Sequence, residues 1–453
     1  MKIEKLHLEN IGVFENLDLE FKSCGQPAKK AEIHIFTGAN GSGKSTLLYA
    51  LAGALAGPLQ QPMDTKLIFQ RFHHSNPKAF IEALFENQQV INYTITKRQK
   101  KSYFTGFPLI SDDSPSSSEI SHAYASSNQQ SPNDFINNFM RSQKVPHDRN
   151  EGRSFAAFAY SGNRTFKSLD ELTTEEMMDW DPYNNTLSFL ETNSERIIQS
   201  IANQKIKQAI ELSQNNQEAA KQYNLVVQSI ENAIENIVGW NIKFKLQTNP
   251  LNLFLEVNQK VLDFNVLPDG LKSIMSLIAD LIRRLDKIVW VDNGNVLEHP
   301  FILLLDEIDI HLHPAWQRKI LPVIQKIFPN AQIFVSTHSP FVVGSVSDAY
   351  VYSFKLTENV SILDKVEPSQ AGNSYSLILE TIFGVEESFD EETETQFRQF
   401  YQYRDDIRQG DDNKIEQWLQ LARDMMTKGI EVADIVGMEL RQMSRILDKD
   451  LSL

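Results

Sequence analysis

The feature that most constrains this chain is a glycine-rich stretch, GANGSGKST, which runs from Gly38 to Thr46. It follows the apolar, strand-like segment from Glu32 to Gly38 and precedes an apolar segment typical of a helix. Its spacing matches G-x-x-x-x-G-K-[ST], in which backbone N–H groups of the loop and of the helix N-terminus point at a phosphate chain. The pattern therefore predicts a strand–loop–helix unit that binds phosphate groups, and a chance glycine turn is a poor alternative in this context.

Individual residues of the loop have expected roles. Gly41 and Gly43 permit a close approach of the backbone and unusual backbone angles. The Lys44 ammonium is expected on the β- and γ-phosphates, and the Ser45 hydroxyl is expected on Mg²⁺. The predicted nucleotide-binding residues of the loop are Gly38, Asn40, Gly41, Gly43, Lys44, Ser45 and Thr46.

A second motif ends a buried apolar run, FILLLDEID, with Asp306 and Glu307. A carboxylate at the end of a central strand can reach Mg²⁺, and we assign that role to Asp306. Glu307 is then placed to orient and deprotonate an attacking water, as a catalytic base. Taken alone, the pattern also fits an acidic loop after a core strand. A phosphate loop in the same chain favours the catalytic interpretation.

Histidines follow both of the later apolar strands. His338, in VSTHSP, lies in a Ser/Thr-rich turn and is predicted to bond a γ-phosphate as a catalytic residue; the alternative is an ordinary turn histidine. His311 and His313 have metal-ligand residue types at a spacing that shares one strand face. Two histidines without a third ligand are weak evidence for a metal, so packing or hydrogen bonding is the favoured interpretation.

The segment VLPDGLKSIMSLIADLI, from Val266 to Ile282, places a proline, an acid and a glycine before an apolar helix. The start of such a helix offers unpaired N–H groups and the positive end of the helix dipole, which is a second anion site. We predict that Asp269, Gly270 and Lys272 contact nucleotide. Two anion sites in one chain suggest one nucleotide held between two copies, each giving a phosphate loop and a distal helix start.

This combination of motifs resembles the heads of ABC-type ATPases of the RecF/SMC and overcoming-lysogenization-defect kind. The strings LPDGLKSIMSLIADLIRRLD and LLLDEIDIHLHPAWQ are most similar to PtuA-type ATPases of bacterial Septu and retron anti-phage systems. FAYSGNRTF, from Phe158 to Phe166, also resembles a family element. The specific resemblance covers Met1–Leu55, Phe155–Phe166 and Val261–Val343.

The resemblance implies an α/β fold: an ABC-type P-loop ATPase head, with a mixed sheet and an antiparallel lobe, plus a helical insert and a helical C-terminal region. It implies ATP and Mg²⁺ as cofactors, with Asp309 in the loop that meets the opposite protomer. The family signature has a serine where this chain has Pro268, so a direct donor to the γ-phosphate is lost. We therefore expect slow turnover, with Gly270 amides, Lys272 or Ser273 as candidate replacements.

The predicted organisation has four parts. Residues 1–60 form the N-terminal lobe, 61–260 an insert with a hairpin, a Ser-rich loop at about 108–150 and a helical subdomain, 261–360 the C-terminal lobe, and 361–453 a helical region.

Hydrophobic periodicity predicts the elements within these parts. Alternating residues predict two N-terminal strands, a hairpin and three strands before the second anion site: Lys2–Asn10 and Glu15–Phe21, then Ala79–Arg98, then Ile242–Gln247, Leu251–Val257 and Lys260–Val266. Helical spacing predicts helices between Leu187 and Val238 and from Gln396 onward.

The basic cluster KRQKK, beside Tyr103 and Phe104, is interpreted as a solvated hairpin tip or a nucleic-acid contact. The last region carries an aromatic stripe at helical spacings, which is interpreted either as part of a hydrophobic core or as a docking surface for a partner: Phe397, Phe400, Tyr401 and Trp418. ABC-type heads often carry a glutamine after the first lobe. In this chain the position is hard to assign, and three residues are weak candidates: Gln70, Asn163 and Arg164.

Composition limits the partners and the location. The formal net charge of −15 over 453 residues argues against general nucleic-acid binding. One cysteine and no run of about 18 apolar residues predict a cytoplasmic protein without a membrane partner. The resemblance implies a dimer or higher homo-oligomer and a separate HNH nuclease similar to PtuB, because we find no nuclease pattern in this chain. It leaves open two further kinds of partner: a reverse transcriptase with its non-coding RNA, and DNA.

Two further functions compete with that of an anti-phage ATPase. A RecF/SMC-like ATP-gated DNA-binding protein of repair or maintenance shares the same motifs and differs in DNA affinity and partner. The motor subunit of a membrane transporter is disfavoured by the short insert and by the N-terminal LHLENIGVF pattern. The acidic balance favours a protein that acts through a partner.

Overall fold

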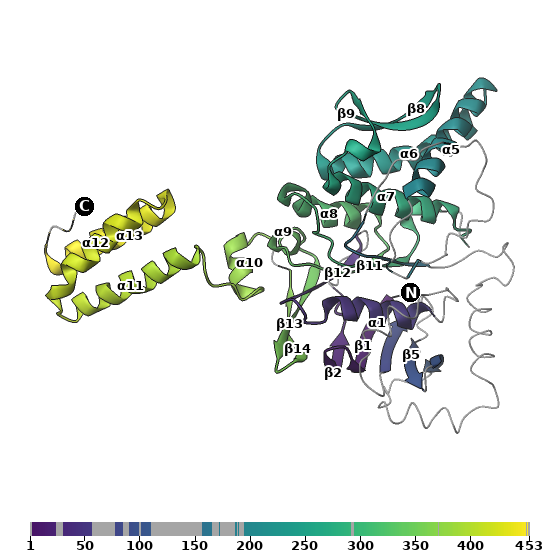
Figure 1. Ribbon diagram of the computed structural model, residues 1–453. Helices are drawn as coiled ribbons and strands as arrows, with labels where there is room; N and C mark the ends of the chain where they lie inside the picture. Colours follow the sequence, from purple (N-terminus) through teal and green to yellow (C-terminus); the bar gives the residue numbers. More distant parts are fainter. Residues whose placement is uncertain are drawn as a thin grey trace. The chain divides into compact units, whose positions relative to one another are not determined.

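The computed structural model (Figure 1) describes residues 2–23, 30–56, 78–84, 90–98, 101–109, 156–164, 172, 186–187, 189, 194–290, 294–369, 371–449 and 451. The chain divides into two compact units, Met1–Ile378 and Leu379–Leu453. The predicted Ser-rich loop falls almost entirely outside the described residues, as does Gln70. Among the helices that the structure describes, none is long and apolar enough to cross a membrane.

A six-stranded sheet forms the centre of the first unit, in the order β14-β13-β3-β12-β11-β7. Neighbouring strands from β7 to β13 are parallel, and only the β13–β14 pair is antiparallel. The carboxyl ends of the parallel strands therefore meet at one edge, which is where open α/β sheets bind ligands. The strands are β3 (Glu32–Gly38), β7 (Ala156–Tyr160), β11 (Phe301–Leu305), β12 (Gln332–Ser336), β13 (Ala349–Thr357) and β14 (Val360–Pro368).

A second, antiparallel sheet has the order β2-β1-β4-β5-β6. The predicted N-terminal strands and the predicted hairpin before Arg98 are confirmed, and β6 is a further strand that was not predicted from the sequence. The basic cluster falls at the β5–β6 connection, and its residues 99 and 100 are outside the described part. The strands are β1 (Lys2–Ile11), β2 (Phe14–Glu20), β4 (Lys78–Leu84), β5 (Val90–Arg98) and β6 (Lys101–Leu109).

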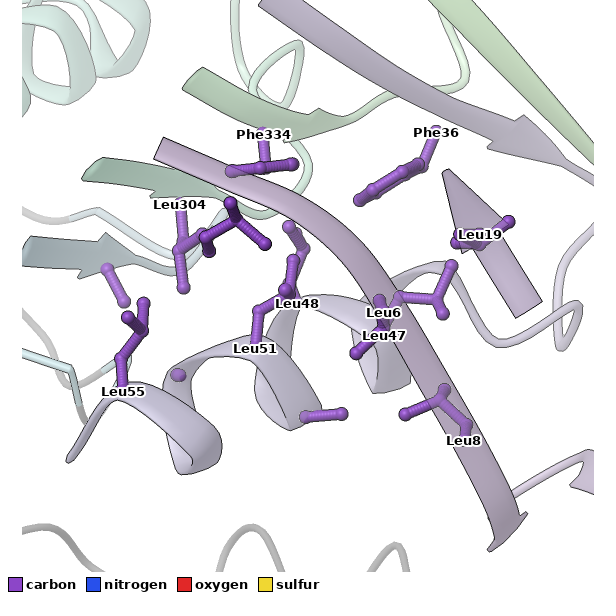
Figure 2. Close-up of a cluster of buried hydrophobic side chains, with 14 of the residues drawn as sticks. Leu6, Leu8, Leu19, Phe36, Leu47, Leu48, Leu51, Leu55, Leu304 and Phe334 are labelled. Carbon is purple, nitrogen blue, oxygen red and sulfur yellow. The ribbon is translucent and has the colours of Figure 1, made fainter. Parts of the chain in front are cut away.

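Helix α1 (Lys44–Ala56) contacts strands of both sheets. A helix buried on all sides needs apolar residues around its whole circumference, and the sequence STLLYALAGAL supplies them. Leu47, Leu48, Leu51 and Leu55 are fully buried. Figure 2 shows these leucines packed with side chains of β1, β2, β3, β11 and β12, so this core fixes α1 directly after the phosphate loop.

The longer helices of the first unit other than α1 lie on the opposite side of the central sheet (Figure 1). The helical part predicted between residues 187 and 238 is a hairpin of α5 (Ser194–Ser213) and α6 (Gln217–Val238). Both helices contact α7 (Asp269–Lys287), and α6 also contacts α8 (Pro314–Ile327). The predicted strands between the hairpin and α7 form a small sheet of β8 (Ile242–Thr248), β9 (Leu251–Val257) and β10 (Lys260–Leu262).

The helical C-terminal region begins later than residue 361, because the alternating segment Val360–Pro368 forms the edge strand β14. The short helices α9 (Pro340–Val343) and α10 (Tyr375–Thr381) flank the β13–β14 hairpin in sequence. The four-part division of the chain stays a prediction, and the second compact unit begins at Leu379.

The second unit contains α11 (Glu391–Arg408), α12 (Ile415–Met426) and α13 (Ile430–Leu447). Helix α11 begins earlier than the predicted start near residue 396, because the Asp390 side chain caps its N-terminus and acidic residues suit the positive end of the dipole. Phe397, Phe400 and Trp418 are buried together, and the Trp418 Nε1–H donates to the Phe400 carbonyl oxygen at 3.0 Å. This packing favours the core interpretation of the aromatic stripe.

Candidate functional site

The motifs that lie far apart in sequence meet in one pocket at the carboxyl ends of the parallel strands. The pocket has a volume of about 290 Å³. Its lining combines the phosphate loop with one acid and one histidine from later strands, and with a turn between β1 and β2. The lining residues are Gly12, Val13, Asn40, Gly41, Gly43, Lys44, Ser45, Thr46, Glu307 and His338.

The phosphate loop needs its glycines for two different physical reasons. Gly38, Gly41 and Gly43 all have positive φ, at 143°, 83° and 88°. A methyl group on Gly38 would lie 2.4 Å from the Phe354 carbonyl oxygen, and one on Gly43 would lie 2.5 Å from the Phe14 ring. Gly41, by contrast, has no neighbour within 4 Å of that position. Gly38 and Gly43 are therefore required both by close packing and by their positive φ angles. Gly41 has a positive φ as well, but it faces open space at the pocket.

Lys44 points along the loop at the base of the pocket. Its Nζ donates to the carbonyl oxygens of Gly38 and Ala39, each at 2.9 Å. Burial lowers the pKa of Lys44, while the carboxylates of Asp306 and Glu307 oppose that shift. The ammonium is thus held by weak carbonyl acceptors, and an anionic group would be a stronger partner for it.

Asp306 and Ser45 are brought together as the sequence predicted. The Ser45 hydroxyl donates to Asp306 Oδ1 at 2.9 Å, and the Ser336 hydroxyl donates to the same oxygen at 2.6 Å. The Asp306 backbone N–H donates to the Tyr160 carbonyl oxygen at 2.9 Å, which fixes the end of β11 against β7. Hydroxyl and carboxylate oxygens side by side are the donors that Mg²⁺ prefers, so this pair fits the ion.

Glu307 sits on a turn that tertiary contacts hold in place. Its φ is 47°, an uncommon angle for a residue with a side chain, and its N–H donates to the Ser336 hydroxyl at 2.8 Å. Gly162 lies directly against it: a methyl group there would be 2.8 Å from Glu307 Cβ and 3.1 Å from Glu307 Oε2. Gly162 thus leaves the room that the Glu307 side chain occupies.

His338 lines the same pocket as Glu307. Burial lowers its pKa, and the nearby Lys44 charge lowers it further against the opposing carboxylates. The preceding residue, Thr337, donates its hydroxyl to Asp309 Oδ1 at 2.5 Å. The segment that carries His338 therefore also anchors the loop that carries Asp309.

The start of α7 does not reach the pocket of its own chain. Asp269, Gly270 and Lys272 are not among the described residues that line the pocket. Asp269 has a side chain that is 79% exposed, and the Lys272 Nζ lies 3.7 Å from its carboxylate. Pro268 caps the helix without a side-chain hydrogen bond, so the first N–H groups of α7 have no side-chain cap.

Gly270 has an additional reason to be glycine. It is buried, and a methyl group on it would lie 2.6 Å from the His311 carbonyl oxygen and 3.0 Å from the Trp316 ring. The missing side chain lets α7 pack closely on the segment that follows β11. From sequence this glycine was explained by anion binding alone, and the packing was not foreseen.

His311 and His313 do not form a metal site with other described residues, where no group of three ligand side chains is found. His313 caps α8, because its Nδ1 accepts from the Ala315 N–H at 3.2 Å. This agrees with the favoured hydrogen-bonding interpretation. Of the candidates for the missing glutamine, Asn163 is exposed and Arg164 is buried.

Three residues at the site were missed from sequence. Gly162 and Val13 each follow a strand in a short turn, which is a weak signal by itself. Ser361, on β14, donates its N–H to the Val13 carbonyl oxygen and its hydroxyl to the Ser42 carbonyl oxygen, each at 2.7 Å. This serine ties the β1–β2 turn to the phosphate loop, and only the fold reveals the contact.

Comparison with protein families identifies the chain. Residues 33–344 match the family described as AAA domain, putative AbiEii toxin, Type IV TA system. The chain belongs to this family. The match spans the phosphate loop, Asp306, Glu307 and His338, so the motif residues that meet in the pocket all fall inside the AAA domain.

Relatives carry names that confirm the resemblance inferred from sequence. A retron Ec83 probable ATPase of Escherichia coli is 34% identical over 173 residues, covering 38% of this chain and 31% of that protein. A retron Vc95 probable ATPase of Vibrio cholerae is 22% identical over 79% of this chain and 76% of that protein. Septu protein PtuA of Bacillus thuringiensis is 28% identical over 34% of this chain and 40% of that protein. The matches to the Ec83 and PtuA proteins thus span less than half of those proteins.

Solved structures similar to this AAA-domain chain include SMC heads at low identity. An SMC head bound to the C-terminal winged-helix domain of ScpA is 13% identical, covers 81% of this chain and 98% of that chain, and has a TM-score of 0.47. An SMC head from Thermotoga maritima is 12% identical, covers 81% of this chain and 99% of that chain, and has a TM-score of 0.40. The mixed sheet with its antiparallel lobe, and the AAA-domain match, confirm the predicted fold class.

Proposed function

We propose that this chain is the ATP-binding and ATP-hydrolysing subunit of an anti-phage defence complex, and that it regulates a separate HNH nuclease. The observation that carries the proposal is the convergence of Lys44, Ser45, Asp306, Glu307 and His338 around one pocket. The names of the retron and Septu relatives support the defence context.

The proposed chemistry assigns one task to each group. Lys44 and the loop N–H groups bind the β- and γ-phosphates, and Ser45 with Asp306 holds Mg²⁺. When bound, Mg²⁺ neutralises charge that develops on the phosphate oxygens. Glu307 accepts the proton of the attacking water, and His338 hydrogen-bonds the γ-phosphate. The position of Lys44, Ser45, Glu307 and His338 in the lining of the pocket, and the bond from Ser45 to Asp306, support these roles.

We further propose that two copies share each nucleotide, with the start of α7 of one copy facing the phosphate loop of the other. Within one chain, the described lining of the pocket leaves out α7, although the helix start has N–H groups without a side-chain cap. The Asp269 carboxylate is itself negative at this end, and Lys272 offsets it. Pro268 cannot donate to the phosphate, so slow turnover fits this arrangement.

The proposal is tested with this chain, purified alone and co-expressed with an HNH nuclease whose gene neighbours that of the chain in its host genome; a host genome without such a gene would contradict the proposed partner. We expect slow ATP hydrolysis that requires Mg²⁺ and stops with EDTA, and we expect ATP to change DNA cleavage by the co-purified complex. A wild-type protein that binds ATP but does not hydrolyse it would contradict the enzymatic part. Cleavage that is indifferent to ATP would contradict the regulatory part.

The contact between Gly162 and Glu307 gives a specific prediction. Gly162→Ala should lower kcat about tenfold or more, because the new methyl group displaces Glu307 from its position by the pocket. The affinity for ATP should stay within about threefold, since the phosphate loop is untouched. The measurement is steady-state hydrolysis with calorimetric ATP binding.

Gly410→Ala is a suitable control for Gly162→Ala, because Gly410 lies in the second unit with open space around it. Its φ of 104° means that the control carries a backbone cost, so thermal unfolding should be followed for both variants. An unchanged kcat in Gly162→Ala would contradict the prediction, because the rate of hydrolysis would then not depend on the position of the Glu307 side chain against Gly162.

A further inference from the structure

Arg164 joins three separate elements beside the pocket. Its Nε donates to the Ser273 hydroxyl at 3.0 Å, one turn into α7. One terminal nitrogen donates to the Ser161 carbonyl oxygen at 3.0 Å, in its own turn after β7. The other donates to the Ile308 carbonyl oxygen at 3.2 Å, one residue after Glu307. The guanidinium is a rigid planar fork, so these three bonds fix three elements relative to each other.

The environment of Arg164 shows that this link is built into the interior. Arg164 is only 4% exposed. Burial lowers its pKa to about 10, against the opposing charges of Asp309, Asp306 and Glu307. A buried cation is costly unless it is hydrogen-bonded and faces negative charge, and both conditions are met. The cluster of acids around the pocket therefore has a fixed positive neighbour on the side of α7.

A second contact ties the same strand to the same helix. The Tyr160 hydroxyl donates to Asp280 Oδ2 at 3.0 Å, further along α7. Asp280 also accepts from Arg283 at 2.5 Å and from Arg284 at 2.6 Å. Since the Tyr160 carbonyl oxygen accepts from the Asp306 N–H, the end of β7 contacts both α7 and the end of β11. A shift of α7 would therefore act directly on the turn that carries Glu307.

We propose that Arg164 is a positioning residue that ties the start of α7 to the Glu307 turn, so that the rate of hydrolysis depends on what binds at the start of α7. The inference rests on the proposed ATPase function. Arg164 acts through Glu307 and needs no contact with nucleotide. This role accounts for a buried arginine whose bonds reach α7 on one side and the catalytic turn on the other.

The sharpest test removes only the α7 end of the link. Ser273→Ala leaves Arg164 its bonds to Ser161 and Ile308, and it removes no group from the phosphate loop. Ser273 was a sequence candidate for a donor to the γ-phosphate, but it is only 1% exposed and its hydroxyl accepts from Arg164 within the chain. We expect kcat to fall about tenfold, the scale of one hydrogen bond to a charged group, while the dissociation constant for ATP stays within about threefold. Ser273→Thr keeps the hydroxyl and should recover most of the lost kcat.

Ser276→Ala is the matched control, because Ser276 is another buried serine of α7 and makes none of the Arg164 bonds described above. It should change kcat by less than about threefold. Arg164→Lys is the companion variant: a single ammonium cannot reproduce the fork, so its kcat should fall at least as far as that of Ser273→Ala. Thermal unfolding of each variant shows whether the protein is folded at the assay temperature.

The outcomes separate the inference from the function on which it rests. An active wild type with an equally active Ser273→Ala overturns the inference and leaves the ATPase proposal intact. Equal losses of kcat in Ser273→Ala and Ser276→Ala also overturn it, because a general loosening of α7 would then be sufficient. A wild type without hydrolysis overturns both.

Discussion

Lys44→Ala should weaken ATP binding by about 100-fold or more, and hydrolysis should fall below detection. The substitution removes the ammonium that rests on two carbonyl oxygens at 2.9 Å and that would transfer to the β- and γ-phosphates. A charge-assisted contact to phosphate in a partly buried site contributes about 3 kcal/mol, which corresponds to the expected loss of affinity. Isothermal calorimetry with ATP and Mg²⁺ measures it.

Lys30→Ala is the control for Lys44→Ala. Lys30 pairs with Asp348 at 3.0 Å with its side chain 63% exposed, so its loss should leave ATP affinity unchanged. The fold of Lys44→Ala should survive, because the two carbonyl groups that accept from Lys44 belong to a loop that is still held by Ser361. Retention of wild-type affinity in Lys44→Ala would show that nucleotide binds elsewhere.

Glu307→Gln should separate binding from chemistry. The amide keeps the size of the side chain and its place against Gly162, but it cannot accept a proton from water. We expect kcat to fall by about 10²–10³-fold while ATP affinity stays within about threefold. Rapid-quench measurement of bound nucleotide should find ATP, with little ADP, on the variant.

Glu298→Gln is the matched control, since Glu298 lies in the short helix Val296–Glu298, outside the motifs, and is not among the described lining residues. Its kcat should equal that of the wild type. If Glu307→Gln hydrolyses ATP at the wild-type rate, another group activates the water; if it binds no ATP, Glu307 has a structural role in the site.

The sequence was most informative where chemistry and local structure coincide. The phosphate loop, the acids after β11 and the histidine after β12 each follow a buried apolar strand, and parallel strands bring such ends to one edge. That they meet at one site could therefore be predicted from the sequence alone. The N-terminal strands and α5–α6 were likewise predicted, because hydrophobic periodicity is a local property of the chain.

Residues that act through distant neighbours could not be found in this way. Gly162 is required by the side chain of Glu307, and Arg164 bonds to Ser273, 109 positions away. Gly270 was predicted for a different reason. The sequence indicated a glycine at an anion site, and the fold adds close packing against His311 as an independent reason for it. Such contacts depend on strand order and helix placement, which no local pattern encodes.

A cross-link tests most directly whether one nucleotide is held by the phosphate loop of one copy and the α7 start of another. One chain carries Ala39→Cys and a second, differently tagged chain carries Asp269→Cys, both with Cys24→Ser. Ala39 and Asp269 are exposed, and only the backbone of Ala39 contacts Lys44. Equal amounts are mixed with ATP and treated with a short bis-maleimide.

We predict a product that contains both tags, at twice the mass of one chain, when ATP is present and not when Lys44→Ala is added to the Ala39→Cys chain. A mixture that demonstrably binds ATP but yields no product with both tags would contradict the shared site.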